Sequence, residues 1–375
     1  MKKKILFLIN DLGQGGAEKV LVNLVNNMDP EKFDISVTAL FGGGVNEQFL
    51  RPHIRYRTIL PRSFPGNSHV MKLLTPRQLH RMYIKEHYDI EVSYLEGPCA
   101  RIISGCTDPA TKKVCWIHIE QRTQKRAAGS FRSYREALDC YGRFDRIVCV
   151  SDTVRKDFLG LMPVKVPTDV LYNTNESAKI MALSGESVED GLFSHREIKL
   201  VGVGKLLKNK GFHRLLPIVQ KLRREGHPVH LYILGIGPME EELKQMAAGL
   251  GIADAVTLLG YQTNPYKYVA KCDLFVCASF AEGFSTAATE ALIVGTPVCT
   301  VEVSGMKEML GDHNEWGIVT ENDEEALYQG IKRLLDEPSL LAHYKKQAVE
   351  RGKTFSTENT VNAVQSMFLD ERKDR

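Results

Sequence analysis

The 375-residue sequence lacks the patterns that mark several other classes of protein. Its eight cysteines form no C-x-x-C pair and no metal-like spacing, and several lie in apolar, strand-like stretches. We interpret them as small core residues of a reduced, cytosolic protein. No apolar run approaches the roughly 18 residues of a membrane span. The sequence therefore predicts a cytoplasmic protein without a transmembrane segment.

Two further motifs are absent near the N-terminus. The first glycines, Gly13, Gly15 and Gly16, lack the G-x-G-x-x-G spacing, so a nicotinamide cofactor is not expected. Lysines at positions 2–4 followed by an apolar run imitate a signal peptide, but the run of residues 5–9 is too short for one. We predict that it forms the first β-strand.

What the chain does contain is an ordinary globular composition with uneven charge. It is 43% hydrophobic and 25% charged, and its length suits two domains rather than one. The net charge is +8 over residues 1–173 and −5 over the remainder. A basic first half favours an anionic partner, such as a phosphorylated acceptor or a membrane surface, although ordinary surface variation gives the same pattern.

Short apolar runs alternate with helix-like segments in both halves, which predicts two α/β domains with parallel, doubly wound sheets. We expect an N-terminal domain over residues 1–173, a C-terminal domain over 174–355 that begins with a polar linker at 174–196, and a C-terminal helix at 356–375 that packs back on the first domain. The predicted strands cover residues 4–9, 34–40, 89–94, 113–117 and 146–150, then 198–203, 229–234, 256–259, 274–277 and 297–301.

The most informative stretch covers residues 282–292, where a Gly-containing turn joins a predicted strand to a predicted helix at 286–294. The unpaired amides of a helix N-terminus bind anions, and phosphate is the obvious one. Glu282 and Glu290 flank this turn, roughly 10–12 Å apart if most of the spacing is helical. Phosphate between two carboxylates fits a nucleotide-sugar, with a polyol on each side. The alternative is a helix cap at Glu282 and a solvated face at Glu290.

The stretch resembles the E-x7-E signature of retaining glycosyltransferases of family four, which have the GT-B fold of two Rossmann-like domains facing across a cleft. Five further elements resemble that family in the same order along nearly the whole chain. They are Gly15-Gly16-Ala17-Glu18, the pair Val150-Ser151 with Val170-Leu171-Tyr172-Asn173, Gly204-Lys205-Leu206 with Lys210-Gly211, Leu234-Gly235-Ile236-Gly237-Pro238, and Leu259-Gly260-Tyr261.

The resemblance implies a role for each matching residue. Glu282 would bind hydroxyls of the donor sugar, Glu290 would bind the ribose, and two lysines would neutralise the diphosphate. His118, at a strand end, would contact the sugar or phosphate, although a lone histidine is more often structural. The implied catalytic residues are Glu282, His118, Lys205 and Lys210, and the implied donor-binding residues are Gly15, Gly16, Gly235, Tyr261, Gly283, Phe284, Ser285, Thr286 and Glu290.

The resemblance further implies front-face attack without a protein nucleophile. No Asp-x-Asp motif follows a predicted strand. We therefore expect no cofactor and no metal, the lysines and the helix dipole supplying positive charge. The expected donor is a UDP-sugar, and the expected acceptor is a saccharide or lipid-linked saccharide.

Residues 121–146 carry seven cationic side chains with Phe131, Tyr134 and Tyr141 interleaved. This pattern predicts peripheral contact with the inner face of the cell membrane or with a charged acceptor, and a solvated helix is the alternative. A nucleic-acid partner is not expected, because no recognised binding motif accompanies the charge.

The sequence leaves two other functions open. One is a GT-B nucleotide-sugar epimerase or a sugar phosphorylase. The other is a catalytically silent, glycosyltransferase-like subunit that binds a partner. The intact Glu282, Glu290, Lys205 and Lys210 favour transfer over both.

Overall fold

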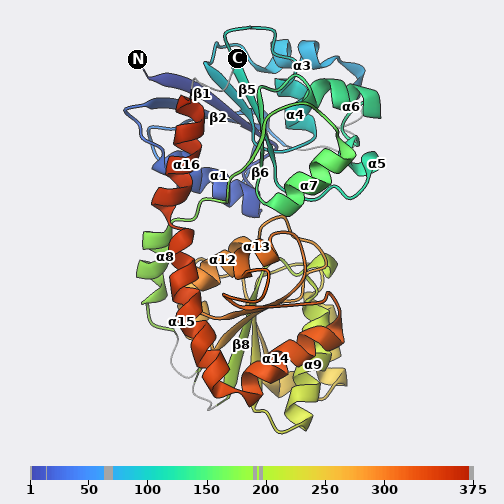
Figure 1. Cartoon of the computed structure of the whole chain (residues 1–375), viewed down its shortest axis with the longest axis vertical. Coiled ribbons are helices and arrows are strands. Elements are labelled where there is room, and N and C mark those ends of the chain that lie inside the picture. The colour runs from blue at the N-terminus through green and yellow to red at the C-terminus, as the bar shows by residue number, and fades with distance from the viewer. Residues whose placement is uncertain (1, 14, 63–70, 189–191, 194–196, 371–375) are drawn as a thin grey trace. The chain divides into compact units, whose positions relative to one another are not determined.

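The computed structural model describes residues 2–13, 15–62, 71–188, 192–193 and 197–370. The chain divides into two compact units, one formed by residues 1–175 together with 357–375 and the other by residues 176–356 (Figure 1). Each unit contains one parallel sheet flanked by helices.

The first unit has a seven-stranded sheet in the order β3-β2-β1-β4-β5-β6-β7, and every pairing is parallel. Strand β1 lies between β2 and β4 in the interior of the sheet, and its residues 5–9 are completely buried. The strands are β1 (Lys3–Ile9), β2 (Phe33–Phe41), β3 (Arg55–Leu60), β4 (Ile90–Ser93), β5 (Lys112–Ile117), β6 (Arg146–Cys149) and β7 (Thr168–Val170). The helices are α1 (Gly16–Asn27), η1 (Glu47–Phe49), α3 (Pro76–Tyr83), α4 (Pro98–Ile103), α5 (Gln124–Ala127), α6 (Tyr134–Tyr141), α7 (Asp152–Leu161) and α16 (Thr357–Leu369).

Helix α16 packs against the first unit through an aromatic cluster. The ring of Phe368 lies 6.1 Å from that of Phe7, 6.4 Å from that of Phe33 and 6.2 Å from that of Trp116. Gln365 accepts a hydrogen bond from the backbone N–H of Asp29 at 2.7 Å. The C-terminal helix thus completes a core that begins with β1.

The second unit has a six-stranded parallel sheet in the order β10-β9-β8-β11-β12-β13. Its strands are β8 (Ile198–Val203), β9 (Val229–Leu234), β10 (Val256–Gly260), β11 (Leu274–Cys277), β12 (Val298–Val301) and β13 (Ile318–Thr320). Its helices are α8 (Ser177–Ser184), η2 (Lys208–Lys210), α9 (Phe212–Arg224), α10 (Glu240–Gly249), η3 (Ala253–Ala255), α11 (Tyr266–Val269), α12 (Thr286–Ile293), α13 (Met306–Leu310), α14 (Glu324–Asp336) and α15 (Pro338–Thr354).

The structure corrects several expectations about local structure. The polar stretch predicted as a linker contains α8, whose only buried residue is Ile180. Strands β3, β7 and β13 were not expected. In the basic segment at residues 121–146, Phe131 and Tyr141 are each 2% exposed, so these aromatic residues belong to the core and do not form an outer surface.

Two predictions about composition are answered directly. All eight cysteines are free thiols, and seven of them are buried. Among the described residues, no helix combines the length and hydropathy needed to cross a membrane.

Candidate functional site

The turn between β11 and α12 holds the stretch singled out in the sequence. Ser285 is the N-cap of α12, and its side chain accepts a hydrogen bond from the backbone N–H of Ala288 at 3.3 Å. Phe284 is buried, and its ring lies 5.7 Å from that of Phe355. The phenyl ring of Phe284 therefore packs the turn against the interior of the second unit. Only the backbone of this residue is available to a ligand.

Glu282 forms an ion pair that the sequence did not predict. Its Oε1 atom lies 2.6 Å from the Nζ of Lys210 and accepts a hydrogen bond from the hydroxyl of Ser279 at 2.7 Å. Both side chains of the ion pair are largely buried, with 12% exposed for Glu282 and 27% for Lys210. A partly shielded ion pair at a strand end can bind a hydroxyl group and a phosphate oxygen side by side.

Two loops bring this pair together, one after β8 and one after β11, which are neighbours in the sheet. The backbone N–H of Phe280 donates to the carbonyl of Asn209 at 2.8 Å. Gly211 has a φ of +70°, and a Cβ added there would lie 2.0 Å from the carbonyl oxygen of Ala278. Only glycine fits this approach, so Gly211 is what allows Lys210 to reach Glu282.

Glu290 lies in α12, where its residue is 7% exposed, and the hydroxyl of Tyr266 reaches its Oε1 at 3.4 Å. The alternative that placed it on a solvated face is therefore wrong. Because α12 begins at Thr286, only part of the spacing between Glu282 and Glu290 is helical.

The remaining predicted residues of the second unit follow β8, β9 and β10. Gly235 has a φ of +147°, and its backbone N–H donates to the carbonyl of Gly260 at 2.8 Å. Lys205 is exposed, and Tyr261 is 53% exposed. Together with the β11–α12 turn, these residues lie at the carboxyl edge of one parallel sheet, where such sheets bind ligands.

Gly15, Gly16 and His118 belong to the first unit. Gly15 is the N-cap of α1 and Gly16 its first residue. A Cβ added at Gly15 would lie 1.8 Å from a carboxylate oxygen of Glu18, so this side chain folds back over the turn. A phosphate approaching the amides of α1 would have to displace the Glu18 carboxylate, which the sequence did not reveal.

His118 follows β5, and its backbone N–H donates to Oε2 of Glu96 at 3.0 Å. Its ring lies 4.8 Å from that of Tyr94, and its Nε2 is buried without a hydrogen-bond partner among the described residues. Burial lowers the pKa of His118 to about 3, against a smaller opposing effect from a hydrogen bond with the Tyr94 backbone. The imidazole is therefore neutral near pH 7, and Nε2 is a polar atom that a ligand could satisfy.

Glu96 is the residue that sequence reasoning missed. It follows β4, and its Oε1 accepts a hydrogen bond from Gln121 at 3.2 Å in addition to the bond from the His118 backbone. Burial raises its pKa, against hydrogen bonds from His118 and Gln121 that lower it. The available signal was an acidic residue directly after an apolar strand and before Gly97-Pro98.

The buried imidazole predicts acid sensitivity. Between pH 6.5 and the folded-state pKa of about 3, the unfolded chain takes up a proton at His118 that the folded chain does not. His118 therefore does not reduce the free energy of unfolding above pH 6.5, and it reduces that free energy progressively as the pH falls through this window. We expect His118→Gln to reduce the loss of unfolding free energy between pH 6.5 and 5 by about 2 kcal/mol, measured by urea titration.

The exposed His53 provides the control, since His53→Gln should leave the pH dependence unchanged. Equal pH dependence in the wild type and His118→Gln would show that the imidazole is not held neutral by burial.

The chain has two Rossmann-like domains, each with a parallel sheet whose carboxyl edge carries candidate ligand-binding residues. This arrangement is typical of the GT-B fold. Solved structures agree. The chain is similar to Anabaena Alr3699/HepE in complex with UDP, with a TM-score of 0.76 and 19% identity over 98% of this chain and 99% of that one. It is also similar to TarM, with a TM-score of 0.73 and 14% identity over 99% of both chains. The predicted GT-B fold is confirmed.

The family follows from the sequence of each half. Residues 14–174 match Glycosyltransferase Family 4, and residues 185–351 match Glycosyl transferases group 1. The two matches together cover most of the chain, which belongs to the family-four glycosyltransferases.

Two curated relatives are similar over nearly the whole chain. One is the N-acetylgalactosamine-N,N'-diacetylbacillosaminyl-diphospho-undecaprenol 4-alpha-N-acetylgalactosaminyltransferase of Campylobacter jejuni, 28% identical over 94% of this chain and 96% of the relative. The other is the lipopolysaccharide core biosynthesis glycosyltransferase LpsD of Rhizobium meliloti, 28% identical over 95% of this chain and 94% of the relative.

Proposed function

We propose that this glycosyltransferase transfers a hexosyl unit from a UDP-sugar to a saccharide or lipid-linked saccharide acceptor, with retention of the anomeric configuration, in surface-polysaccharide biosynthesis. The observation that carries the proposal is the Lys210–Glu282 ion pair beside the α12 N-terminus, with the buried Glu290 inside the same helix. This arrangement offers a cation and backbone amides to a diphosphate and a carboxylate to the polyol on each side of it.

The diphosphate is the leaving group, and its departure is the demanding step. Lys210 is held in place by Glu282, and the exposed Lys205 precedes it in the same connection after β8. Positive charge that is already in place when negative charge develops lowers the barrier, because no reorganisation is needed at that moment. The amides at the start of α12 add to the same effect.

Each carboxylate takes a different part of the donor. Glu282 has an oxygen beyond the one bonded to Lys210 and Ser279, and it accepts hydrogen bonds from hydroxyls of the transferred sugar. Glu290 accepts hydrogen bonds from the ribose. Its burial strengthens those bonds, because water does not compete for the carboxylate.

Retention fits the constraints on Glu282. A carboxylate that is bonded to both Lys210 and Ser279 is a poor nucleophile, because its charge is already compensated. The acceptor hydroxyl is therefore proposed to attack from the face that the diphosphate leaves, with a phosphate oxygen taking the hydroxyl proton. The lysines and α12 supply the positive charge, so we expect transfer without a metal ion.

The acceptor side is proposed to use the first unit. The neutral His118 has an Nε2 with no partner among the described residues, suited to accept a hydrogen bond from a sugar hydroxyl. The Campylobacter jejuni relative is named for an undecaprenyl-diphosphate acceptor, which supports a lipid-linked saccharide.

The donor is tested by thermal shift of the purified protein with a panel of nucleotide-sugars and free nucleotides. One UDP-sugar should stabilise the wild type, and Glu290→Gln should bind it about 30-fold more weakly. That factor reflects the exchange of two charge-assisted hydrogen bonds for neutral ones, at about 1 kcal/mol each. The exposed Glu321 provides the control, since Glu321→Gln should bind like the wild type.

Product analysis after incubation of the protein with the stabilising donor separates the other functions. Binding without slow hydrolysis or transfer of the donor would favour a catalytically silent subunit. Release of free sugar epimer or of sugar 1-phosphate would favour an epimerase or a phosphorylase. Stabilisation by every nucleotide equally in wild type and Glu290→Gln would remove Glu290 from the donor site.

Peripheral membrane contact is proposed for the exposed cations of the basic segment. Arg146 is not among them, because it is buried and paired with Asp169. Arg132 donates hydrogen bonds to the carbonyls of Lys72 and Leu73, and Leu73 is 78% exposed. An exposed leucine held among cationic side chains is suited to an anionic lipid surface.

Charge reversal tests this contact. The triple variant Lys125→Glu, Arg126→Glu, Arg135→Glu should bind anionic vesicles roughly 100-fold more weakly in co-sedimentation, at about 1 kcal/mol for each cation lost. The control Lys345→Glu, Lys346→Glu changes exposed residues of the other unit. Equal loss per reversed charge in both variants would reduce the effect to net charge.

A further inference from the structure

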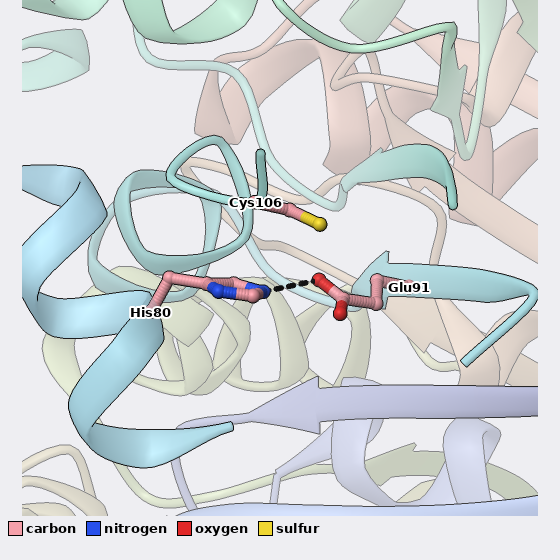
Figure 2. Close-up of side chains that lie close together, drawn as sticks. All are labelled: His80, Glu91 and Cys106. Atoms are coloured by element: carbon pink, nitrogen blue, oxygen red, sulfur yellow. Dashed lines mark hydrogen bonds and ion pairs between the residues drawn. The ribbon is translucent and has the colours of Figure 1, made fainter. Parts of the chain in front are cut away.

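Three side chains with different metal-binding atoms converge in the first unit, away from the residues assigned above. They are His80, Glu91 and Cys106, whose ligand atoms all lie within 4.8 Å of one another. Figure 2 shows the imidazole of His80 pointing at the carboxylate of Glu91, with the sulfur of Cys106 directed toward this pair. The Nε2 of His80 lies 2.7 Å from Oε2 of Glu91.

Each residue comes from a different element. His80 lies in α3, Glu91 near the start of β4, and Cys106 in the connection between α4 and β5. Glu91 lies in the amino-terminal half of β4. Tyr94, Glu96 and His118 follow the carboxyl ends of β4 and β5, at the opposite edge of the sheet. The cluster is thus separate from the residues proposed for transfer, and its chemistry does not depend on that function.

The cluster contains a buried charge that needs a cation. The side chain of Glu91 is 2% exposed, and His80 is the only residue that pairs with it among those the structure describes. A carboxylate in such a place is costly unless it is paired or coordinates a metal.

Cys106 differs from the other cysteines in being partly accessible. It is intermediate in exposure, and the other seven are buried. A thiol that solvent can reach, beside an imidazole and a carboxylate, is able to exchange its proton for a metal ion.

We propose that His80, Glu91 and Cys106 form a binding site for a divalent transition metal ion, with Zn²⁺ as the preferred ion. The donor set favours zinc because Zn²⁺ accepts imidazole nitrogen, thiolate sulfur and carboxylate oxygen, whereas Mg²⁺ and Ca²⁺ prefer oxygen ligands. On binding, the ion takes one lone pair from each ligand, the proton shared between His80 and Glu91 leaves the ligating nitrogen, and the thiol proton passes to solvent. Water completes the coordination.

The movement required of the His80–Glu91 pair is small. Bonds of about 2.0–2.1 Å to nitrogen and oxygen in a tetrahedral site place those two atoms roughly 3.3 Å apart, so the His80–Glu91 pair has to open by about 0.6 Å from its 2.7 Å contact. Opening removes a hydrogen bond that two metal–ligand bonds replace. The bound ion would link α3 and the α4–β5 connection to the central strand β4, which is a stabilising role.

Zinc titration of the full chain tests the site. The protein is stripped with a chelator under reducing conditions and titrated with ZnCl₂ against a chromophoric competitor. We expect one Zn²⁺ per chain and an increase in thermal stability. Titration with CoCl₂ should give the near-ultraviolet thiolate-to-cobalt absorption band. Cys106→Ser should lose this band and bind Zn²⁺ roughly tenfold more weakly or worse, because a thiolate ligand is replaced by a hydroxyl.

A second histidine provides the matched control. His87 and Asp108 form an exposed pair at 2.9 Å in the same unit, without a thiol. His87→Gln should keep the cobalt band and the zinc affinity. If Cys106→Ser fails to fold, His80→Gln takes its place, with folding checked by circular dichroism. The absence of stoichiometric zinc binding, a cobalt spectrum without the thiolate band, or zinc binding that survives Cys106→Ser but falls in His87→Gln would overturn the proposal.

Discussion

Replacement of Lys210 by methionine is expected to lower kcat by about 10²–10³-fold, equivalent to about 3–4 kcal/mol of transition-state stabilisation. Lys210 contacts Glu282 at 2.6 Å and is 27% exposed, so its charge acts where water screens it only partly. Methionine keeps most of the apolar stem of the side chain and removes the ammonium group, together with its bond to Glu282. The measurement is the rate of nucleotide release at a saturating concentration of the nucleotide-sugar that the thermal shift identifies.

The chain contains a matched control two residues away. Lys208 belongs to the same short helix η2 and is exposed. Lys208→Met removes an equal charge from the same loop and should leave kcat within about twofold, because an exposed charge is screened by water and salt. A Lys210→Met variant with raised KM and unchanged kcat would contradict a transition-state role, since uniform binding affects only KM.

Gly235→Ala is expected to destabilise the second unit by roughly 3–5 kcal/mol, the largest effect on stability that we predict. The φ of Gly235 is +147°, which L-residues rarely adopt, and a Cβ there would lie 1.9 Å from the carbonyl oxygen of Gly204. Both partners are backbone, so no side chain can rotate away. The loss should appear as a decrease in Tm of roughly 10 °C.

Gly249 in α10 is the contrasting glycine. Nothing lies within 4 Å of a Cβ added there, and its φ is not positive. Gly249→Ala should be neutral or stabilising by about 0.5–1 kcal/mol, because alanine is favoured over glycine in a helix. If Gly235→Ala were tolerated as well as Gly249→Ala, the close approach of β8 and β9 at the candidate site would be wrong.

Local pattern predicted the central strands well because each is a short, fully buried apolar run in a parallel sheet. The completely buried residues 5–9 of β1 are an example. It missed β3 and β13, which lie at sheet edges. Strand β3 alternates Arg55, Tyr56 and Arg57, and none of its residues is buried. An edge strand with one solvated face has too little apolar content to be distinguished from a polar loop.

For the aromatic residues of the basic segment, the sequence pattern overestimated exposure at the surface. Their spacing among arginines suggested an outward surface, yet Phe131 and Tyr141 have ring centres 5.4 Å apart inside the first unit. Tyr141 lies on the short helix α6 and Phe131 in the connection before it, and neighbouring residues in such segments point in different directions. Composition alone therefore does not separate core residues from solvent-exposed ones.

The sequence by itself determined the fold class, the family and the identity of the candidate donor-binding residues, because glycine turns and carboxylates at strand ends are local features. Only the tertiary structure decided which of those groups interact. The contact between Lys210 and Glu282 spans 72 positions and depends on the close approach at Gly211. The burial of Glu290, the bond between Glu96 and the His118 backbone, and the convergence of His80, Glu91 and Cys106 likewise join separate elements. Such contacts depend on which strands lie side by side, and the order of strands in a sheet is set by packing of the whole unit rather than by any local pattern.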